Sequence, residues 1–287
     1  MYDIKVMKCE KKGREVPDTK ETESVRMEGG IPMMERKEAV LSLSGVYEAD
    51  GPCGWEDGIR VDLTAVEGTT FFCEDAAADH LRHVIDGLPL SGIHWIDSGD
   101  YHYVSLFFLE RIREPFTLVM CDHHSDMQES AFGADLLSCG SWLLQSLKRL
   151  PFLEQVILIG PEDDESMQAE ESIRERVWWI REEELEESME KINSRICGKK
   201  VYISFDKDIL SEDFCDSGWS QGQMTLKTAV EFLDRIKEAS DVIGIDFCGE
   251  TPPKDGGFDP EGMRKNRMTN DSLRACLRDW MKGGEEA

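Results

Sequence analysis

Short, continuously apolar runs alternate along the chain with segments whose apolar residues repeat at helical spacing. The apolar runs are rich in β-branched and aromatic residues and end at glycine, proline or charged residues, which is typical of buried strands. Strands are predicted at 39–47, 92–96, 115–120, 155–160, 177–180, 200–205 and 242–247. Helices are predicted at 76–85, 104–112, 136–150, 182–196, 226–237 and 270–281, and a loop is predicted at 254–269.

The alternation of strands and helices predicts an α/β fold. Strands that are apolar throughout are buried on both faces, so the pattern favours a three-layer α/β/α arrangement with a mainly parallel sheet. We expect one such domain over residues 39–287, because a chain of 287 residues can bury a large core. Residues 1–38 are polar and charged, and we expect an irregular N-terminal segment there.

Polar residues with metal-binding side chains follow four of the predicted strands. They are His102 after strand 92–96, the cluster 122–126 after strand 115–120, Asp206 and Asp208 after strand 200–205, and Glu250 after strand 242–247. In parallel α/β sheets the carboxyl ends of the strands lie at one edge, where ligands gather. We therefore expect these side chains to lie close together.

The residue types at these strand ends predict a metal centre. Unpaired buried charge is costly, and a bound cation is the commonest way to offset it. The candidate ligands are His102, Asp122, His124, Asp126, Asp206 and Asp208. Six nitrogen and oxygen ligands suit two divalent ions that share carboxylates, and they favour manganese or magnesium over structural zinc. Two such ions would lower the pKa of a bridging water and yield a hydroxide that attacks an electrophilic carbon.

The formal net charge of −26 narrows the range of partners. Nucleic acid and anionic membranes would be repelled, whereas a small cationic substrate or carboxylate-bound metal ions suit this sign. The nine cysteines are widely spaced and include no CxxC pair, which argues against a disulfide framework and indicates a reduced, cytoplasmic location. The N-terminus has no apolar signal core, and no stretch is long enough to span a bilayer.

Four short segments around the candidate ligands carry a family resemblance. Residues 122–126 (Asp-His-His-Ser-Asp) resemble an Asp-Ala-His-x-Asp motif, and residues 204–208 (Ser-Phe-Asp-Lys-Asp) resemble a Ser-x-Asp-x-Asp motif. Residues 98–102 are similar to a Gly-Gly-Asp-His-Ser motif, and residues 244–252 are similar to a segment that ends in a glutamate and a proline. In order and spacing the segments resemble the arginase/agmatinase (ureohydrolase) family over roughly residues 90–255.

The resemblance implies an arginase-like fold, a ligand set and an enzyme activity. One manganese ion would be held by His102, Asp122, Asp126 and Asp206, and a second by Asp122, His124, Asp206 and Asp208. Asp126 would also orient the bridging hydroxide and relay its proton, and Glu250 would pair with the cationic group of the substrate. The implied reaction is hydrolysis of a C–N bond in a guanidino or related amidine compound, which releases urea and an amine.

The sequence departs from the family pattern in three places. Tyr101 separates Asp100 from His102, which are adjacent in the family motif. His123 replaces an alanine and is interpreted as a packing residue. The segment after Asp126 lacks the polar loop and the histidine that arginases use. Agmatine, a guanidino acid and an arginine side chain within a peptide therefore stay open as substrates. An amide hydrolase or deacetylase, and a metal-dependent binding protein without turnover, stay open as functions. The resemblance also leads us to expect a homo-oligomer.

Overall fold

The computed structural model describes residues 6–7, 36–50, 58–129, 136–161 and 169–283. The strands are β1 (Val6–Met7), β2 (Lys37–Ser42), β3 (Ile59–Asp62), β4 (Phe72–Cys73), β5 (Gly92–Ile96), β6 (Phe116–Cys121), β7 (Leu137–Ser138), β8 (Leu153–Gly160), β9 (Val177–Arg181), β10 (Lys200–Asp206) and β11 (Asp241–Cys248). The α-helices are α1 (Val46–Ala49), α2 (Asp75–Asp86), α3 (Val104–Leu109), α4 (Trp142–Arg149), α5 (Glu171–Arg174), α6 (Leu185–Ile196), α7 (Leu226–Ala239) and α8 (Pro260–Met281). Short 3₁₀ helices are η1 (Gly99–Tyr101), η3 (Glu182–Glu184) and η4 (Lys207–Ile209).

A nine-stranded sheet in the order β1-β3-β2-β5-β11-β10-β6-β8-β9 runs through the centre of the described residues. Eight of its strands are parallel, and β1 pairs antiparallel with β3 at one edge. The central strands β5 and β6 are buried along their whole length, as the continuously apolar runs predicted. The predicted mainly parallel sheet is therefore confirmed.

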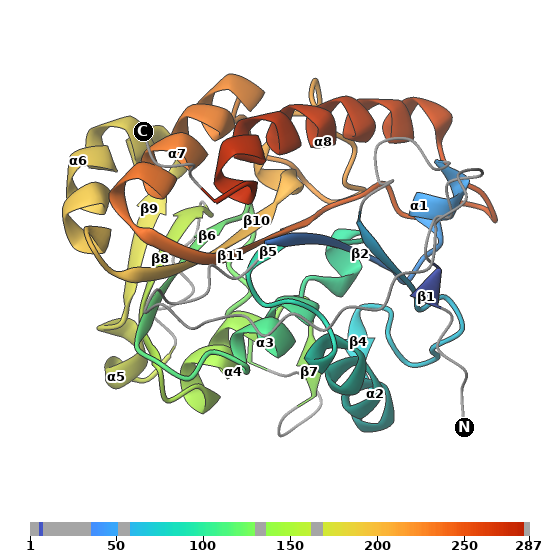
Figure 1. Cartoon of the computed structure of the whole chain (residues 1–287), viewed down its shortest axis with the longest axis horizontal. Coiled ribbons are helices and arrows are strands. Elements are labelled where there is room, and N and C mark those ends of the chain that lie inside the picture. The colour runs from blue at the N-terminus through green and yellow to red at the C-terminus, as the bar shows by residue number, and fades with distance from the viewer. Residues whose placement is uncertain (1–5, 8–35, 51–57, 130–135, 162–168, 284–287) are drawn as a thin grey trace, which may run out of the picture.

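Helices cover both faces of this sheet (Figure 1). On one face, apolar side chains of α2, α3 and α4 pack into one hydrophobic core, and on the other, those of α6, α7 and α8 pack into a second. The two cores make the three-layer α/β/α arrangement that the sequence predicted. Within the described part of the chain, none of the helices combines the length and the hydropathy needed to cross a membrane.

The helix α8 corrects one prediction. The loop predicted at 254–269 ends at Asp259, whose carboxylate accepts hydrogen bonds from two amides of the first turn, and Pro260 opens the helix. Buried positions in its first half are polar, because Asn266 donates to backbone carbonyls of Asp216 and Gly249 instead of packing in an apolar core. The apolar periodicity that marks a helix in the sequence is therefore missing there.

A second, two-stranded sheet pairs β4 with β7. Strand β7 occupies the start of the region 136–150, where the sequence predicted a helix. The observed helix α4 starts only at Trp142. This small sheet lies beside the ends of the central strands and contributes Phe72 and Ser138 to the cavity described below. The predicted irregular segment 1–38 falls mostly outside the described residues, apart from β1 and the start of β2.

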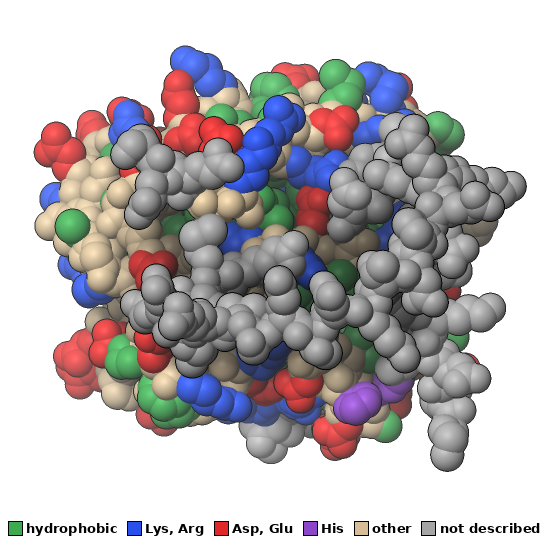
Figure 2. All heavy atoms as spheres, viewed as in Figure 1, with side chains coloured by type: hydrophobic (Ala, Val, Ile, Leu, Met, Phe, Trp, Pro, Cys, Tyr) green, Lys and Arg blue, Asp and Glu red, His purple; other side chains and the backbone are tan. Residues whose placement is uncertain are grey.

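Acidic and basic side chains are interspersed on the described surface seen in Figure 2. Lys and Arg side chains lie among Asp and Glu side chains, and they do not merge into one basic area on that face.

Candidate metal centre

Three side chains stand in a row across neighbouring strands at the carboxyl edge of the sheet. In the parallel register, Phe205 of β10 lies opposite Cys121 of β6, so Asp122 and Asp206 come next to one another. Asp206 in turn lies opposite Cys248, the last residue of β11. Successive residues of a strand point to opposite faces, so one register places Asp122, Asp206 and Cys248 on one side of the sheet.

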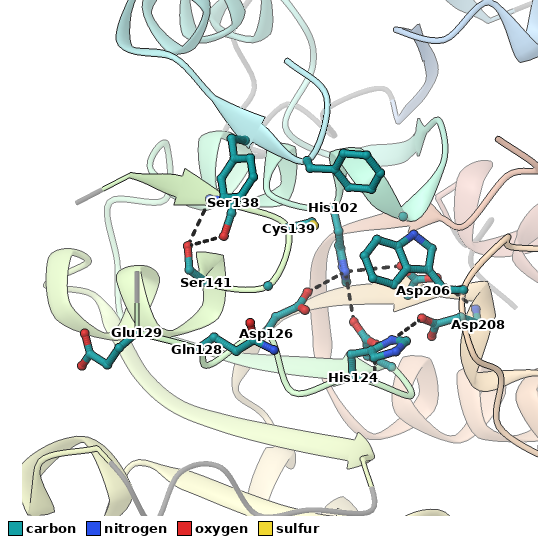
Figure 3. A pocket seen from close by; sticks show the side chains of 16 residues that line it. His102, His124, Asp126, Gln128, Glu129, Ser138, Cys139, Ser141, Asp206 and Asp208 are labelled. Atoms are coloured by element: carbon teal, nitrogen blue, oxygen red, sulfur yellow. Dashed lines mark hydrogen bonds and ion pairs between the residues drawn. The ribbon is translucent and has the colours of Figure 1, made fainter. Parts of the chain in front are cut away.

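His102 reaches over this row from the turn that follows β5. Its Nδ1 lies 3.0 Å from Asp122 Oδ2, 3.1 Å from Asp126 Oδ2 and 3.5 Å from Asp206 Oδ2 (Figure 3). Its Nε2 lies 2.9 Å from the hydroxyl oxygen of Ser204, which itself donates to Asp246 Oδ1 at 2.7 Å.

This chain of hydrogen bonds decides which nitrogen of His102 faces the carboxylates as an acceptor. Because the Ser204 hydroxyl donates to Asp246, it accepts a hydrogen bond from Nε2–H when the imidazole of His102 is neutral. The lone pair of Nδ1 is then left pointing at three carboxylates, and this buried atom has no hydrogen-bond partner. A histidine fixed through one nitrogen and open at the other is the usual arrangement of a metal ligand, so a cation fits this position.

His124 forms the second half of the centre. Its Nδ1 lies 2.7 Å from Asp208 Oδ2 and 3.7 Å from Asp122 Oδ1, and its Nε2 lies 2.9 Å from the hydroxyl of Ser220. Backbone amides hold the carboxylates in place, because His124 N donates to Asp122 Oδ1 and His123 N donates to Asp208 Oδ1. Asp122 thus faces both histidines.

Asp126 is held in an unusual conformation on the far side of His102. Its φ of 52° is left-handed, which is uncommon for a residue other than glycine and indicates local strain of about 1 kcal/mol. The indole Nε1–H of Trp142 donates to Asp126 Oδ2 at 2.6 Å, and the amide of Leu143 donates to its carbonyl. The first turn of α4 therefore fixes the direction in which this carboxylate points.

The electrostatics of the centre call for positive charge. Burial is the largest cause that raises the pKa of Asp122, Asp126 and Asp206, and repulsion between the neighbouring carboxylates adds to it. Burial likewise raises the pKa of Asp208, to about 6. Carboxylates gathered so closely resist ionisation unless a cation joins them.

The structure brings all six predicted metal ligands together. His102, Asp122 and Asp126 form one group whose candidate ligand atoms lie within 4.8 Å of each other, and Asp122, His124 and Asp208 form a second. Asp206 belongs to a third group, with His102 and Cys248. The described residues thus fit two divalent ions, with Asp122 between them. Whether each side chain binds a metal stays a prediction.

Glu250 does not lie with these residues. Its carboxylate is buried and pairs with Lys207 Nζ at 2.7 Å, and it accepts a further hydrogen bond from Asn270. Gly249 precedes it with a φ of 88°, at a point where any side chain would collide with Asp206. Glu250 is absent from the described lining of the cavity, so its placement lends no support to a direct contact with a substrate.

His123 also lies away from the cavity that the other residues line. It borders a separate hollow with Glu182 and Gly222, and its contribution to the centre is the backbone amide that binds Asp208. This agrees with its interpretation as a supporting residue, although its role as such stays a prediction.

A cavity of about 310 Å³ opens above the candidate ligands. Its floor is formed by His102, Asp122, His124, Asp126, Asp206 and Asp208, and its walls by Gln128, Glu129, Ser138, Cys139, Gly140 and Ser141 (Figure 3). Phe71, Phe72 and Trp219 form its rim and are partly exposed, Trp219 at 37%. The ring of Trp219 lies 5.5 Å from that of His124 and 5.9 Å from that of Phe71.

Several residues of this site escaped the sequence analysis. Trp142 and Trp219 reach it from a helix start and a loop far along the chain, so no local spacing marks them. Ser204 and Cys248 could have been found, because both lie in or beside the strand-end motifs and on the face of the aspartates. Cys248 does not stand out in the sequence, because it follows an apolar run, where a cysteine is usually a small hydrophobic residue.

Comparison with known proteins gives the family. A sequence model of the arginase family matches residues 61–261, which include all six candidate ligands. The chain belongs to the arginase family. The resemblance noted in the motifs is thereby confirmed, and family membership supports a metal-dependent hydrolase of guanidino or amidino groups in general terms.

Individual relatives are distant from this member of the arginase family. An uncharacterized protein of Thermotoga maritima is 31% identical over 162 residues, a match that covers 56% of this chain and 59% of that protein. Proclavaminate amidino hydrolase from Streptomyces clavuligerus superposes with a TM-score of 0.59 at 14% identity, covering 84% of this chain and 92% of that one. Agmatine ureohydrolase of Thermoplasma volcanium gives 0.57 at 14% identity, covering 88% and 93%. These likenesses confirm the arginase-like fold.

Proposed function

We propose that this protein is a dinuclear metal hydrolase that cleaves a C–N bond of a guanidino or related amidine compound and releases urea and an amine. The observation that carries the proposal is the buried Nδ1 of His102, which has no hydrogen-bond partner and faces Asp122, Asp126 and Asp206. Within the family that this chain belongs to, such a centre performs hydrolysis of this kind. The family resemblance implies manganese, and the His124 half, whose ligands are nitrogen and oxygen only, suits it.

Each half of the centre has its own ligands. His102, Asp122, Asp126 and Asp206 would hold one ion, and Asp122, His124, Asp206 and Asp208 would hold the other. Bound divalent ions would supply Lewis acidity and lower the pKa of water at the centre. The protein fixes its carboxylates in advance through backbone amides and the indole of Trp142, so little reorganisation accompanies the reaction.

Asp126 is the side chain best placed to hold and move a proton. It is buried beside His102 and borders the cavity, and burial raises its pKa, so its carboxylate takes up a proton more readily than a carboxylate in water. The hydrogen bond from Trp142 to Oδ2 leaves Oδ1 of this carboxylate free of that contact. We assign Asp126 the transfer of a proton from the attacking water to the leaving amine.

The walls of the cavity favour a cationic substrate that carries no carboxylate of its own. Glu129 is the one charged residue in the described walls, which include no lysine or arginine, and the acidic residues of the floor are the candidate metal ligands. The aromatic rim offers ring faces to a cation, which attract a guanidinium or ammonium group. Among the substrates left open by the sequence, agmatine fits these walls better than a guanidino acid, whose carboxylate would meet no positive partner.

Urea release provides the test. Purified protein loaded with Mn²⁺ is incubated with agmatine, arginine, 4-guanidinobutyrate, formiminoglutamate and arginine-containing peptides, and we expect the highest kcat/KM with agmatine. For formiminoglutamate, which yields formamide in place of urea, the product measured is formamide. Asp208→Asn is expected to abolish turnover while the fold is retained, because the amide keeps the shape but not the charge of this ligand. Asp79→Asn, at an exposed position of α2, is the matched control and should act like wild type.

Two outcomes would contradict the proposal. Protein that binds no metal after loading and dialysis would remove its basis. Protein that binds metal and releases urea from none of these compounds would point to a binding protein, and release of acetate from acetylated amines with one ion per chain would point to a deacetylase.

A further inference from the structure

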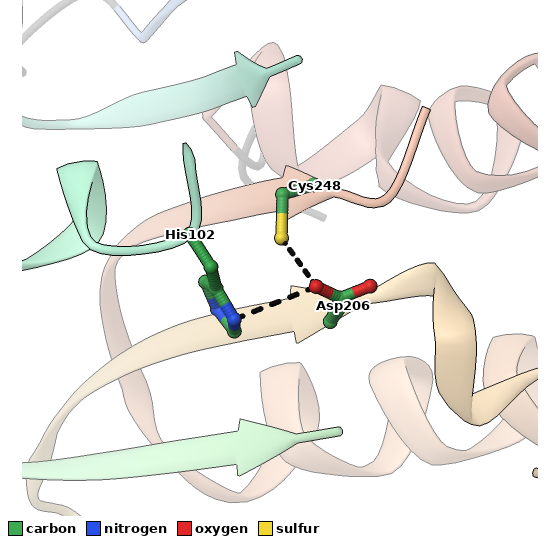
Figure 4. Close-up of side chains that lie close together, drawn as sticks. All are labelled: His102, Asp206 and Cys248. Atoms are coloured by element: carbon green, nitrogen blue, oxygen red, sulfur yellow. Dashed lines mark hydrogen bonds and ion pairs between the residues drawn. The ribbon is translucent and has the colours of Figure 1, made fainter. Parts of the chain in front are cut away.

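A sulfur atom lies inside the candidate metal centre. Cys248 ends β11 directly beside Asp206 of β10, and its Sγ lies 2.8 Å from Asp206 Oδ2 (Figure 4). The same Asp206 oxygen lies 3.5 Å from Nδ1 of His102. Candidate ligand atoms of these three residues lie within 4.8 Å of one another, and all three residues are buried.

Cys248 belongs to the apolar core on the α2–α4 side of the sheet, but its sulfur points to polar groups at the strand ends. Cys121 is equally buried at the end of β6, but it belongs to the opposite apolar core, among residues such as Ile157 and Phe205. Cys248 instead points from the sheet toward a carboxylate and an imidazole, as Figure 4 shows. A side chain needed only for packing has no reason to face two metal-binding groups.

The neighbouring imidazole of His102 is a second, independent observation that indicates a bound cation here. Nδ1 of His102 is buried and has no hydrogen-bond partner, because Nε2 takes the contact to Ser204. Ligand atoms that share one ion at about 2.0–2.3 Å each lie roughly 3–4 Å apart, which is the range of the contacts between Asp206 and His102. A cation beside His102 would therefore also lie within reach of the sulfur.

We propose that Cys248 is a thiolate ligand of the metal ion on the His102 side of the centre. The proposal rests on the function proposed above and adds sulfur to a ligand set that the family resemblance describes as nitrogen and oxygen only. On binding, the sulfur–metal bond forms as the S–H bond breaks, and the thiol proton leaves to solvent. Thiolate is a soft ligand, so this half of the centre prefers zinc, ferrous iron or cobalt over manganese, while the His124 half keeps harder ligands.

Cobalt absorption tests the proposal without reference to activity. The full-length protein is loaded with Co²⁺, dialysed and examined for ligand-field bands in the visible range and for a thiolate-to-cobalt charge-transfer band in the near ultraviolet. Wild type is expected to show both. Cys248→Ser is expected to lose the charge-transfer band and to show about a 10-fold smaller preference for Zn²⁺ over Mn²⁺ in competition dialysis.

Cys139→Ser is the matched control. Cys139 lines the same cavity but belongs to none of the groups of candidate ligands, so this variant should keep the charge-transfer band. A zinc–sulfur distance of about 2.3 Å in the X-ray absorption spectrum of Zn²⁺-loaded wild type supports the proposal even if Cys248→Ser fails to fold.

The outcomes separate the two proposals. Ligand-field bands without a charge-transfer band in wild type overturn the sulfur ligand and leave the metal centre standing. A charge-transfer band that survives in Cys248→Ser, or one that disappears in Cys139→Ser, also overturns it. Protein that retains no cobalt overturns the proposed function together with this inference.

Discussion

The two halves of the metal centre differ in their access to water. On the His102 side the imidazole is 1% exposed, and behind it stand Ser204, Asp246 and Cys248, all buried. On the His124 side the imidazole is 33% exposed and contacts Ser220 and the ring of Trp219 at the cavity rim. A buried ligand set holds an ion through fixed geometry, whereas an exposed one lets ligands and substrate exchange. From this difference we infer that the His102 half would anchor the metal ions and that the His124 half would meet the substrate.

Substitution of the residue shared by both halves should have the largest effect. Asp122→Ala removes a carboxylate that faces His102 and His124 alike, so we expect loss of both ions and a fall in kcat of at least ~10³-fold. Metal content by mass spectrometry and urea release measure the two effects. Retention of two ions per chain in this variant would show that Asp122 is not a ligand shared by the two halves.

Removing each histidine separately tests whether the two halves differ in how tightly they hold their metal ion. His124→Ala is expected to leave one slowly exchanging ion per chain, whereas His102→Ala should lose the buried ion and lower the Tm of the metal-loaded protein. An ion present at 100 times its Kd stabilises the fold by about 2.7 kcal/mol, which is the scale of the expected loss. Chelator-induced release followed in time distinguishes the halves. Equal release rates for the two variants would contradict an anchored and an exchanging half.

The pKa of Asp208 predicts a pH dependence of the metal-free protein. Burial raises this pKa to about 6, so the folded state binds a proton more tightly than the unfolded state. Its contribution to stability is therefore favourable below its usual pKa and is lost as the pH rises through 6. Asp208→Asn should stabilise the metal-free protein by about 2–3 kcal/mol at pH 7.5 and by only about 1 kcal/mol at pH 4.5.

Urea unfolding at both pH values, compared with wild type, measures this difference. The comparison cancels titrating groups that do not contact Asp208, such as His94, whose pKa burial lowers to about 4. It does not cancel His124, because Asp208 is one of the groups that raise the pKa of His124 to about 11. The same substitution should weaken metal binding at pH 7.5. If Asp208→Asn were less stable than wild type at pH 7.5 without metal, ionised Asp208 would not destabilise the metal-free fold, and the prediction would be wrong.

Substitution of Trp142 tests whether its hydrogen bond orients the carboxylate of Asp126 on the His102 side of the centre. Trp142→Phe keeps most of the ring but removes the Nε1–H that donates to Asp126 Oδ2. A hydrogen bond to a charged group contributes about 1.5–3 kcal/mol, so we expect kcat to fall roughly 10–100-fold with KM and metal content nearly unchanged. A larger change in KM than in kcat would instead assign Asp126 to substrate binding.

Substitution of Trp219, in the aromatic rim on the His124 side of the centre, should have the smallest effect. Trp219→Ala removes a ring face beside His124, and a cation–π contact at a partly exposed site contributes about 0.5–1 kcal/mol, or a 2- to 5-fold rise in KM for agmatine. Trp219→Phe retains the ring and should recover part of the affinity. An unchanged KM in Trp219→Ala would place the substrate away from this rim.

The sequence by itself determined the fold and the gathering of the candidate ligands, because both follow from local patterns along the chain. Continuous apolar runs, alternating with helical periodicity, required a parallel sheet covered on both faces, and the carboxyl ends of parallel strands had to meet at one edge. Asp122, His124, Asp126, Asp206 and Asp208 therefore lay together in the structure as predicted.

Only the tertiary structure decided what surrounds these ligands. Glu250, predicted beside the substrate, pairs with the buried Lys207 and is not part of the described cavity lining, so its contact with a substrate stays a prediction. Trp142 reaches Asp126 and Trp219 reaches the cavity rim from other segments of the chain, and strand register makes Cys248 a neighbour of Asp206. Such contacts depend on which strands pair and on how loops pack across them, and the spacing of residues along the chain does not record either.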